Sequence, residues 1–206
     1  MRKIILMAVV ALILSVQNLC GAVTIEEFKS PLYEKILYPM VRMEDKSIEQ
    51  KINLAILAEI DNFVADVNRS IQEYNAELLN AYVNYEIACN EAGNSKILSV
   101  VFTESKYFAR ANRPQACKHA LNFNLKTGEL IGINYLTDSD AGIIDKLSQK
   151  LREKSERENI SLNHDALPLK KLPENFYWDA NLHVHFIFQY YEVAAGSAGI
   201  IDVDME

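Results

Sequence analysis

The sequence is poor in the residues that mark turns and disulfide scaffolds, and its basic residues are outnumbered. Its 206 residues include 7 Gly, 5 Pro and 3 Cys, and no repeat or low-complexity segment is present. Lys and Arg number 21 against 28 Asp and Glu, which gives a formal net charge of −7. This balance disfavours nucleic acid and anionic lipid surfaces as partners. A cationic partner remains, or no charged partner at all.

Short catalytic motifs are also missing. The sequence contains no G-x-S-x-G nucleophile elbow, no P-loop, no dinucleotide-binding fingerprint and no C-x-x-C pair. No cofactor is therefore expected, and a noncatalytic protein is favoured over an enzyme.

The N-terminus has the pattern of a secretory signal. Arg2 and Lys3 precede an apolar run over 4–16, which is shorter than the roughly 20 residues of a membrane span. Small residues in Cys20-Gly21-Ala22 predict cleavage before Val23, although Cys20 leaves lipidation open. We expect residues 1–22 to be a signal peptide and the mature chain to be periplasmic or secreted, without a membrane span.

Two cysteines remain after this cleavage, Cys89 and Cys117. An even number of cysteines in an oxidising compartment predicts a disulfide between them. Free buried thiols and reactive thiols are the alternatives.

Two segments have helical periodicity. In the first, Ser47 and Gln50 form a capping box before a stripe of apolar residues at helical spacing, which are Ile48, Ile52, Ile56, Ile60, Phe63 and Val67. The second is predicted over 139–159, capped by Asp140, with an apolar stripe that contains Leu147 and Leu151.

The strand patterns are grouped rather than alternating with helices. Strands are predicted at 35–43, bent or at a sheet edge because of Pro39, and at 81–88, 97–103, 121–125, 130–133, 182–190 and 200–205. Turns are predicted at 91–94 and 126–129. The predicted class is α+β, with a mainly antiparallel sheet packed against two amphipathic helices. Residues 23–206 are predicted to form a single module, with a division into lobes at about 30–120 and 121–206 left open.

Two sets of residues are candidates for function. His183 and His185 point to the same face of a strand and could share a metal with His119, His164 or Asp179, or they could lie on a solvated face. Arg110 and Arg113 in a polar loop, with the aromatic residues Trp178 and Tyr191, are candidates for a binding surface.

The chain resembles a pair of bacterial envelope domains. This pair forms the extracytoplasmic region of RsiV-type anti-sigma factors and precedes the catalytic domain of PdaC-type peptidoglycan deacetylases. Three stretches carry the resemblance: Tyr38-Pro39 with 48–63, residues 122–130 (NFNLKTGEL), and residues 186–199 (FIFQYYEVAAGSAG). Where that family usually has Gly-Gly-Ala-His before the hairpin, this chain has ARANRPQAC at 109–117.

The resemblance implies a noncatalytic recognition module of the cell envelope. Its partner would be an envelope protein or peptidoglycan fragment, with lysozyme a candidate because the anti-sigma relatives bind it. A metal-dependent envelope hydrolase using His183 and His185 is one alternative, and a structural component of an envelope complex is another.

Overall fold

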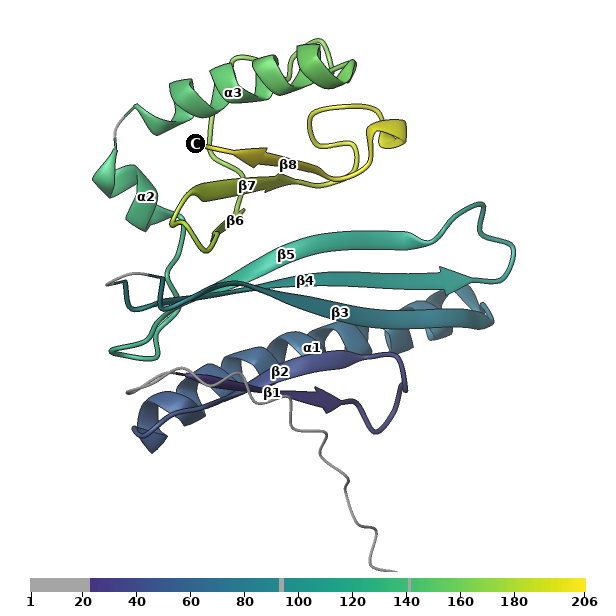
Figure 1. Cartoon of the computed structure of the whole chain (residues 1–206). Coiled ribbons are helices and arrows are strands. Elements are labelled where there is room, and N and C mark those ends of the chain that lie inside the picture. The colour runs from purple at the N-terminus through teal and green to yellow at the C-terminus, as the bar shows by residue number, and fades with distance from the viewer. Residues whose placement is uncertain (1–22, 93–94, 141) are drawn as a thin grey trace, which may run out of the picture.

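The computed structural model describes residues 23–92, 95–140 and 142–206. The predicted signal peptide and part of the predicted turn at 91–94 lie outside this range. The elements follow one another as β1 (Thr24–Lys29), β2 (Leu37–Arg42), α1 (Lys46–Tyr74), β3 (Leu78–Asn90), β4 (Ile97–Phe108), β5 (Gln115–Asn124), α2 (Asn134–Ser139), α3 (Ile143–Glu158), β6 (Asn175–Trp178), β7 (Val184–Phe188), the 3-10 helix η1 (Gly196–Ala198) and β8 (Ile201–Asp204) (Figure 1).

The strands form three antiparallel sheets, β1–β2, β3–β4–β5 and β6–β7–β8. A single parallel bridge between Ile36 and Val83 joins the first sheet to the second. The predicted α+β class with mainly antiparallel pairing is confirmed. The described residues contain a third helix, the short α2, beyond the two that were predicted. None of the helices in this part of the chain is long and apolar enough to cross a membrane.

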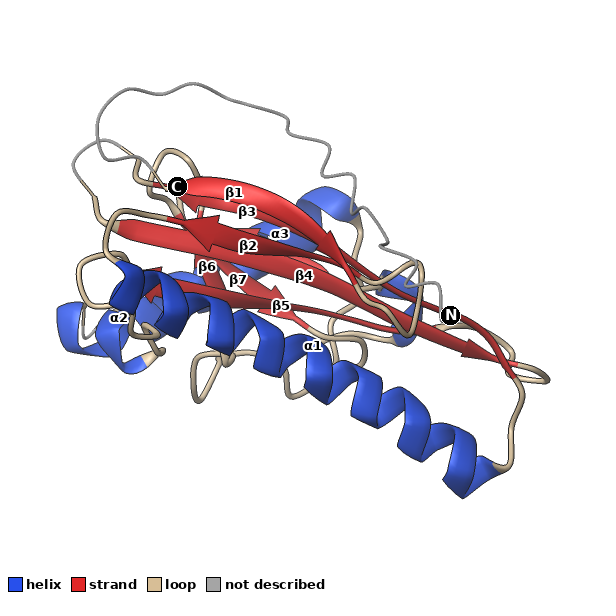
Figure 2. Ribbon diagram, turned by 90° about the horizontal axis from the view of Figure 1, so that it is seen from below, coloured by secondary structure: helices blue, strands red, loops and turns tan. Residues whose placement is uncertain are grey.

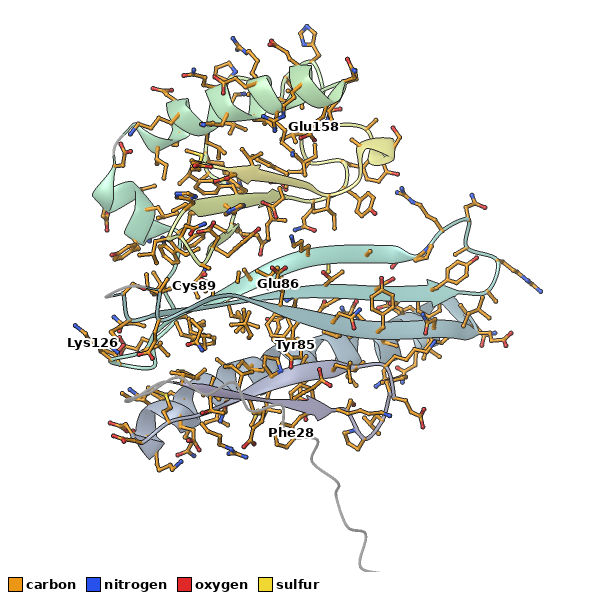
Figure 3. All side chains as sticks on the ribbon, in the orientation of Figure 1. Phe28, Tyr85, Glu86, Cys89, Lys126 and Glu158 are labelled. Carbon is orange, nitrogen blue, oxygen red and sulfur yellow. The ribbon has the colours of Figure 1, made fainter. Side chains whose placement is uncertain are left out.

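The central sheet β3–β4–β5 lies between two hydrophobic cores. Its lower face packs with α1 and the β1–β2 hairpin, and its upper face contacts the β6–β8 sheet that α3 covers (Figure 1). Tyr85 and Glu86, neighbours on β3, lie on opposite sides of this sheet (Figure 3). The two cores lie on opposite faces of this one sheet. The division of the chain into lobes at about 30–120 and 121–206 stays a prediction.

The helix α1 runs alongside the strands β1–β5 (Figure 2). Its predicted apolar stripe is buried, with Ile52, Ile56 and Val67 fully inaccessible to solvent. The helix begins one residue before Ser47, and Asp45 is its N-cap: the Asp45 carboxylate accepts hydrogen bonds from the backbone N–H groups of Ser47 and Ile48. A carboxylate at this position satisfies N–H groups that have no partner within the helix.

A buried amide fixes α1 to β2. The Asn53 side chain accepts a hydrogen bond from the Val41 N–H at 2.8 Å and donates one to the Val41 carbonyl at 3.0 Å. Asn53 is 7% exposed and Val41 is fully buried. One side chain thus pairs both backbone groups of Val41, as a neighbouring strand would.

The predicted disulfide is wrong, because Cys89 and Cys117 are free and lie on opposite faces of the central sheet. A bulge between Ile87 and Cys89 reverses the alternation of β3, so Cys89 points into the upper core. Cys117 lies on the α1 side, opposite Glu104 on β4. Cys89 faces Ser99, five residues (104 − 99) along β4 from Glu104. That is about 16 Å at strand spacing, against about 7 Å between the Cα atoms of a disulfide.

The hairpin predicted around residues 121–133 forms only in part. Gly128 makes the turn with φ of +74°, and its Cα lies against Ile48 and Lys51 of α1. The predicted returning strand is wrong: Leu130 makes one bridge to Phe123, and the chain then enters α2. Asp140 is not the cap of α3, which begins at Ile143 with Gly142 as its N-cap. The strands β1 and β6 were not predicted.

Replacing the buried amide should destabilise the protein. Asn53→Ala leaves the Val41 N–H and C=O buried without partners, and we expect a loss of about 2–3 kcal/mol in the free energy of unfolding. Urea denaturation measures this. Asn68→Ala is the matched control, because Asn68 on the same helix accepts its hydrogen bond from Tyr33 at an exposed site. An Asn53→Ala cost no larger than that of Asn68→Ala would contradict the role given to Asn53.

Candidate functional site

One face of the β6–β8 sheet carries polar side chains toward the central sheet. Tyr177, His185 and Asp204 lie in register on three neighbouring strands, and Asp202 is two residues from Asp204 on β8. Because side chains alternate across a strand, all four share a face. The other face is apolar and packs under α3.

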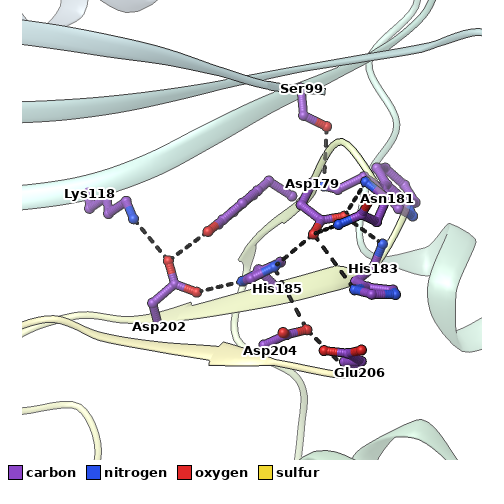
Figure 4. A network of polar contacts seen from close by, with 11 residues as sticks. Ser99, Lys118, Asp179, Asn181, His183, His185, Asp202, Asp204 and Glu206 are labelled. Carbon is purple, nitrogen blue, oxygen red and sulfur yellow. Dashed lines mark hydrogen bonds and ion pairs between the residues drawn. The ribbon is translucent and has the colours of Figure 1, made fainter. Parts of the chain in front are cut away.

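His185 is enclosed by an aromatic ring and three carboxylates (Figure 4). Its ring stacks on that of Tyr177, with centroids 4.6 Å apart. Nδ1 is 3.1 Å from Asp202 Oδ1, while Nε2 is 3.8 Å from Asp179 Oδ2 and 3.7 Å from Asp204 Oδ1. The Asp202 hydrogen bond raises the pKa of His185 more than burial lowers it. A positively charged imidazole is therefore favoured here.

Asp202 joins this group to the central sheet. Its Oδ2 accepts hydrogen bonds from Lys118 Nζ of β5 and from the Tyr177 hydroxyl, both at 2.9 Å. Burial alone would raise the pKa of Asp202, but the hydrogen bonds from His185, Lys118 and Tyr177 hold it at about 2. Burial, and then the negative charge of Asp202, raise the pKa of Tyr177. The tyrosine thus stays a neutral donor, and the network resembles a structural ion cluster more than a proton-transfer site.

The structure brings the predicted metal candidates His183, His185 and Asp179 together, but the three do not form a compact ligand set. His183 Nδ1 and His185 Nε2 both approach Asp179 Oδ2, at 3.7 and 3.8 Å, with Asp179 held in the β6–β7 turn by the backbone N–H of His183. Among the described residues on this sheet, the compact set of possible ligands is His183, Asp204 and Glu206, without His185. It adjoins a pocket of about 390 Å³ between β8 and α3.

The remaining proposed ligands lie elsewhere. His119 is on the α1 face of the central sheet, opposite Phe102 on β4. His164 is exposed in the connection between α3 and β6. A metal shared by His183 and His185 stays a prediction.

Two of the predicted binding residues meet on the surface. Arg113 lies in the β4–β5 connection, and Tyr191 lies in the segment after β7. Arg113 donates a hydrogen bond to the Tyr191 hydroxyl. Its guanidinium carbon is 5.0 Å from the Tyr191 ring centroid and 5.3 Å from that of Tyr190. Tyr191 is 60% exposed. We call Arg113, Tyr190 and Tyr191 the Arg113–Tyr191 cluster.

The backbone fixes the direction of the Tyr191 side chain. Tyr191 has a φ of +67°, a left-handed conformation that is uncommon for a non-glycine residue. Its ring lies against Gly196, where an added Cβ would clash with the Tyr191 ring. Any other residue at 196 would require the outer end of the Tyr191 ring to move, so Gly196 allows the ring to lie where it does.

The other two predicted binding residues, Arg110 and Trp178, do not join this cluster in the same way: the first is exposed and the second is buried. Arg110 is exposed in the same connection as Arg113, with a φ of +68°. The prediction of a surface role for Trp178 is wrong: this side chain is 5% exposed and packs edge-on against Phe176 and Tyr135 in the upper core. Its position on β6 places it on the α3 face, opposite to Tyr177.

Sequence reasoning missed the partners of His185. Asp202 and Lys118 lie far from it in sequence, and only the pairing of β7 with β8 and the contact with β5 bring them together. The alternation of Tyr177 with two buried aromatic neighbours was the available signal, but β6 itself was not predicted.

Comparison with known proteins supports the fold alone. No protein-family model matches the chain, and no curated protein matches its sequence. A member of the DUF3298 family from Bacteroides fragilis NCTC 9343 has a similar solved structure, with a TM-score of 0.57, 13% identity and coverage of 89% of this chain and 90% of that chain. A DUF3298 family protein from Pseudomonas aeruginosa PAO1 has a TM-score of 0.52, 10% identity and coverage of 92% and 91%. The family's function is unknown.

The Asp202 network should make the free energy of unfolding decrease both at acidic pH and at pH values above the His185 titration. The lowered pKa of Asp202 gives a stabilisation present above about pH 4 and lost as the pH falls toward 2. The raised pKa of His185 gives a second stabilisation, which is fully present below about pH 6.5. This stabilisation is lost as the pH rises through the pKa of His185 in the folded state. Wild type should therefore exceed Asp202→Asn in free energy of unfolding by about 2 kcal/mol near pH 5.5, and by less at either extreme.

Urea denaturation across this pH range measures the difference. Asp165→Asn, at an exposed loop position, is the control and should differ little from wild type. A difference between wild type and Asp202→Asn that stays constant with pH would show that the network does not titrate as described.

Proposed function

We propose that the protein is an exported, noncatalytic binding module of the cell envelope that recognises a carboxylate-bearing wall fragment at the Arg113–Tyr191 cluster. The observation that carries the proposal is the contact of the exposed Arg113 guanidinium with two tyrosine rings, those of Tyr190 and Tyr191. The resemblance to RsiV-type and PdaC-type envelope regions supports the same class of function.

The sequence of residues 1–22 supports export. Two cations, an apolar run and a small-residue cleavage site form the usual order of a secretory signal. A chain delivered across the membrane meets peptidoglycan and its soluble fragments.

The chemistry of the cluster suits such a fragment. A guanidinium presents paired N–H donors that match a carboxylate, and wall peptides carry free carboxylates. An exposed tyrosine ring offers an apolar face for a sugar ring and a hydroxyl for hydrogen bonding. Arg110, exposed in the same connection, adds positive charge in an otherwise acidic protein.

The cluster is also suited to recognition because little ordering is needed on binding. Gly196 allows the Tyr191 ring to lie where it does, and the Arg113 hydrogen bond to the Tyr191 hydroxyl orients both side chains. Side chains that are already ordered lose less conformational entropy when a ligand binds.

Calorimetric titration of the protein with soluble peptidoglycan fragments tests this proposal. Arg113→Ala and Tyr191→Ala should each weaken binding by roughly 10-fold or more, as expected for central residues of a binding site. Arg157→Ala is the matched control, since it removes an exposed arginine from α3, and it should change the Kd by less than about 2-fold. Unchanged binding by both cluster variants, or no binding at high micromolar fragment, would overturn the proposal.

Two further arms distinguish the alternatives. Binding to lysozyme but not to fragments would point to a basic protein as the partner, attracted by the acidic surface. Cleavage of the fragment in the presence of Zn²⁺, lost in a His183→Ala/His185→Ala variant, would instead support the metal-dependent hydrolase.

A further inference from the structure

A second group of polar side chains lies under the central sheet, away from the Arg113–Tyr191 cluster. It consists of Glu59 on α1, Glu104 on β4, and Cys117 and His119 on β5. Cys117 is paired in register with Glu104, and His119 is two residues further along β5, on the same face. Three separate elements thus place a thiol, an imidazole and two carboxylates together.

The potential ligand atoms of this group are close to one another. His119 Nε2 is 3.1 Å from Glu59 Oε1 and 3.8 Å from Glu104 Oε1, and Cys117 Sγ is 3.5 Å from Glu104 Oε2. One ligand atom each from Glu104, Cys117 and His119 falls within 4.8 Å of the others.

The buried carboxylate lacks a hydrogen-bond partner for one oxygen. Glu104 is 6% exposed, and its Oε1 has no hydrogen bond among the described residues, while Nε2 of His119 contacts Glu59. The lysine two residues further along β4, Lys106, contacts Asp66 and Ser70 instead. A buried carboxylate oxygen without a donor is costly, so this oxygen and the imidazole nitrogen beside it favour a cation between them.

We propose that Glu104, Cys117 and His119 form a Zn²⁺ site. Glu59 contacts His119 but lies outside this compact set, and it would complete the site after a movement of its side chain. Zinc takes thiolate, imidazole and carboxylate ligands in tetrahedral geometry at about 2.0–2.3 Å. In such a tetrahedron the ligand atoms lie about 3.3–3.8 Å apart. The His119–Glu104 distance of 3.8 Å and the Cys117–Glu104 distance of 3.5 Å match that range, each measured to a different oxygen of the Glu104 carboxylate.

The choice of metal follows from the ligand set. A thiolate with an imidazole favours zinc over Mg²⁺ or Ca²⁺, which prefer oxygen ligands alone. The exposed set on the upper sheet, His183 with Asp204 and Glu206, has no thiolate and no ligand that is nine-tenths buried. The two sets are therefore separable by experiment.

An ion can reach this site. β5 is the outer strand of the central sheet, and the His119 and Glu59 side chains are 18% and 26% exposed. A bound ion would join α1 to β4 and β5, and it would occupy Cys117. This site goes beyond the proposed wall-fragment function and does not depend on it.

Cobalt and zinc titrations of the reduced full-length mature chain test the proposal. We expect one equivalent of Co²⁺ to bind with a thiolate-to-cobalt charge-transfer band in the near ultraviolet, displaced by Zn²⁺. Cys117→Ser should abolish the band, and Glu104→Gln should weaken binding by roughly 100-fold. Cys89→Ser, which removes the other free thiol, and His183→Ala should both bind like wild type.

A second measurement uses the unaltered protein, so it does not depend on any variant folding. Zn²⁺ should slow alkylation of Cys117 by roughly 10-fold or more, because a coordinated thiolate is a poor nucleophile, without protecting Cys89 in the same way. The proposal is overturned if no thiolate-to-cobalt band forms, if Cys117→Ser retains the bound equivalent, or if Zn²⁺ leaves the alkylation of Cys117 unchanged.

Discussion

The docking of the β6–β8 sheet on the central sheet depends on buried hydrogen bonds to the backbone of β6. Ser99 Oγ donates to Asn122 Oδ1 at 2.7 Å and accepts from the Trp178 N–H at 3.2 Å, while Asn122 Nδ2 donates to the Phe176 carbonyl at 2.7 Å. Ser99 and Asn122 are almost completely buried. Polar groups buried this deeply are stable only when paired, so β6 can dock in one position and register. Asn53 does the same for β2 from the other side of the molecule.

This docking assembles the exposed cluster from two parts of the chain. Arg113 belongs to the connection between β4 and β5, and Tyr190 and Tyr191 follow β7 in the upper layer. Lys118 on β5 adds two contacts between the layers. Its side chain donates a hydrogen bond to Asp202, and its backbone N–H donates one to the side chain of Gln189. The His185 network is therefore best understood as part of the support for the surface cluster. The Glu104–Cys117–His119 group lies on the α1 face of the central sheet, opposite to the face that contacts the β6–β8 sheet.

The sequence predicted the parts of this structure that depend on local pattern. The apolar stripe of α1, the strands β3, β4, β7 and β8 in outline, the antiparallel α+β class and the turn at Gly128 follow from periodicity and turn chemistry. The bulge after Ile87 does not, because it is set by pairing across the sheet, and it reverses the direction of Cys89. Of the candidate binding residues, Arg113 and Tyr191 meet, whereas Trp178 is buried because β6 places it on the α3 face. The expectation of a disulfide drew attention away from the contact of Cys117 with Glu104. The sequence could not show this group of residues, because Glu59 and Glu104 come from distant segments.

The most direct test of the role given to Ser99 and Asn122 is whether the two cores unfold together. Trp178 is the only tryptophan and lies in the upper core, so its fluorescence reports that core, while far-UV circular dichroism is dominated by α1 and the long central strands. The account predicts coincident urea transitions by both probes in the wild type, as expected for one cooperative unit. In a Ser99→Ala/Asn122→Ala variant, the Trp178 transition should move to lower urea than the circular dichroism transition. Separate transitions in the wild type, or coincident ones in the variant at the wild-type midpoint, would contradict it.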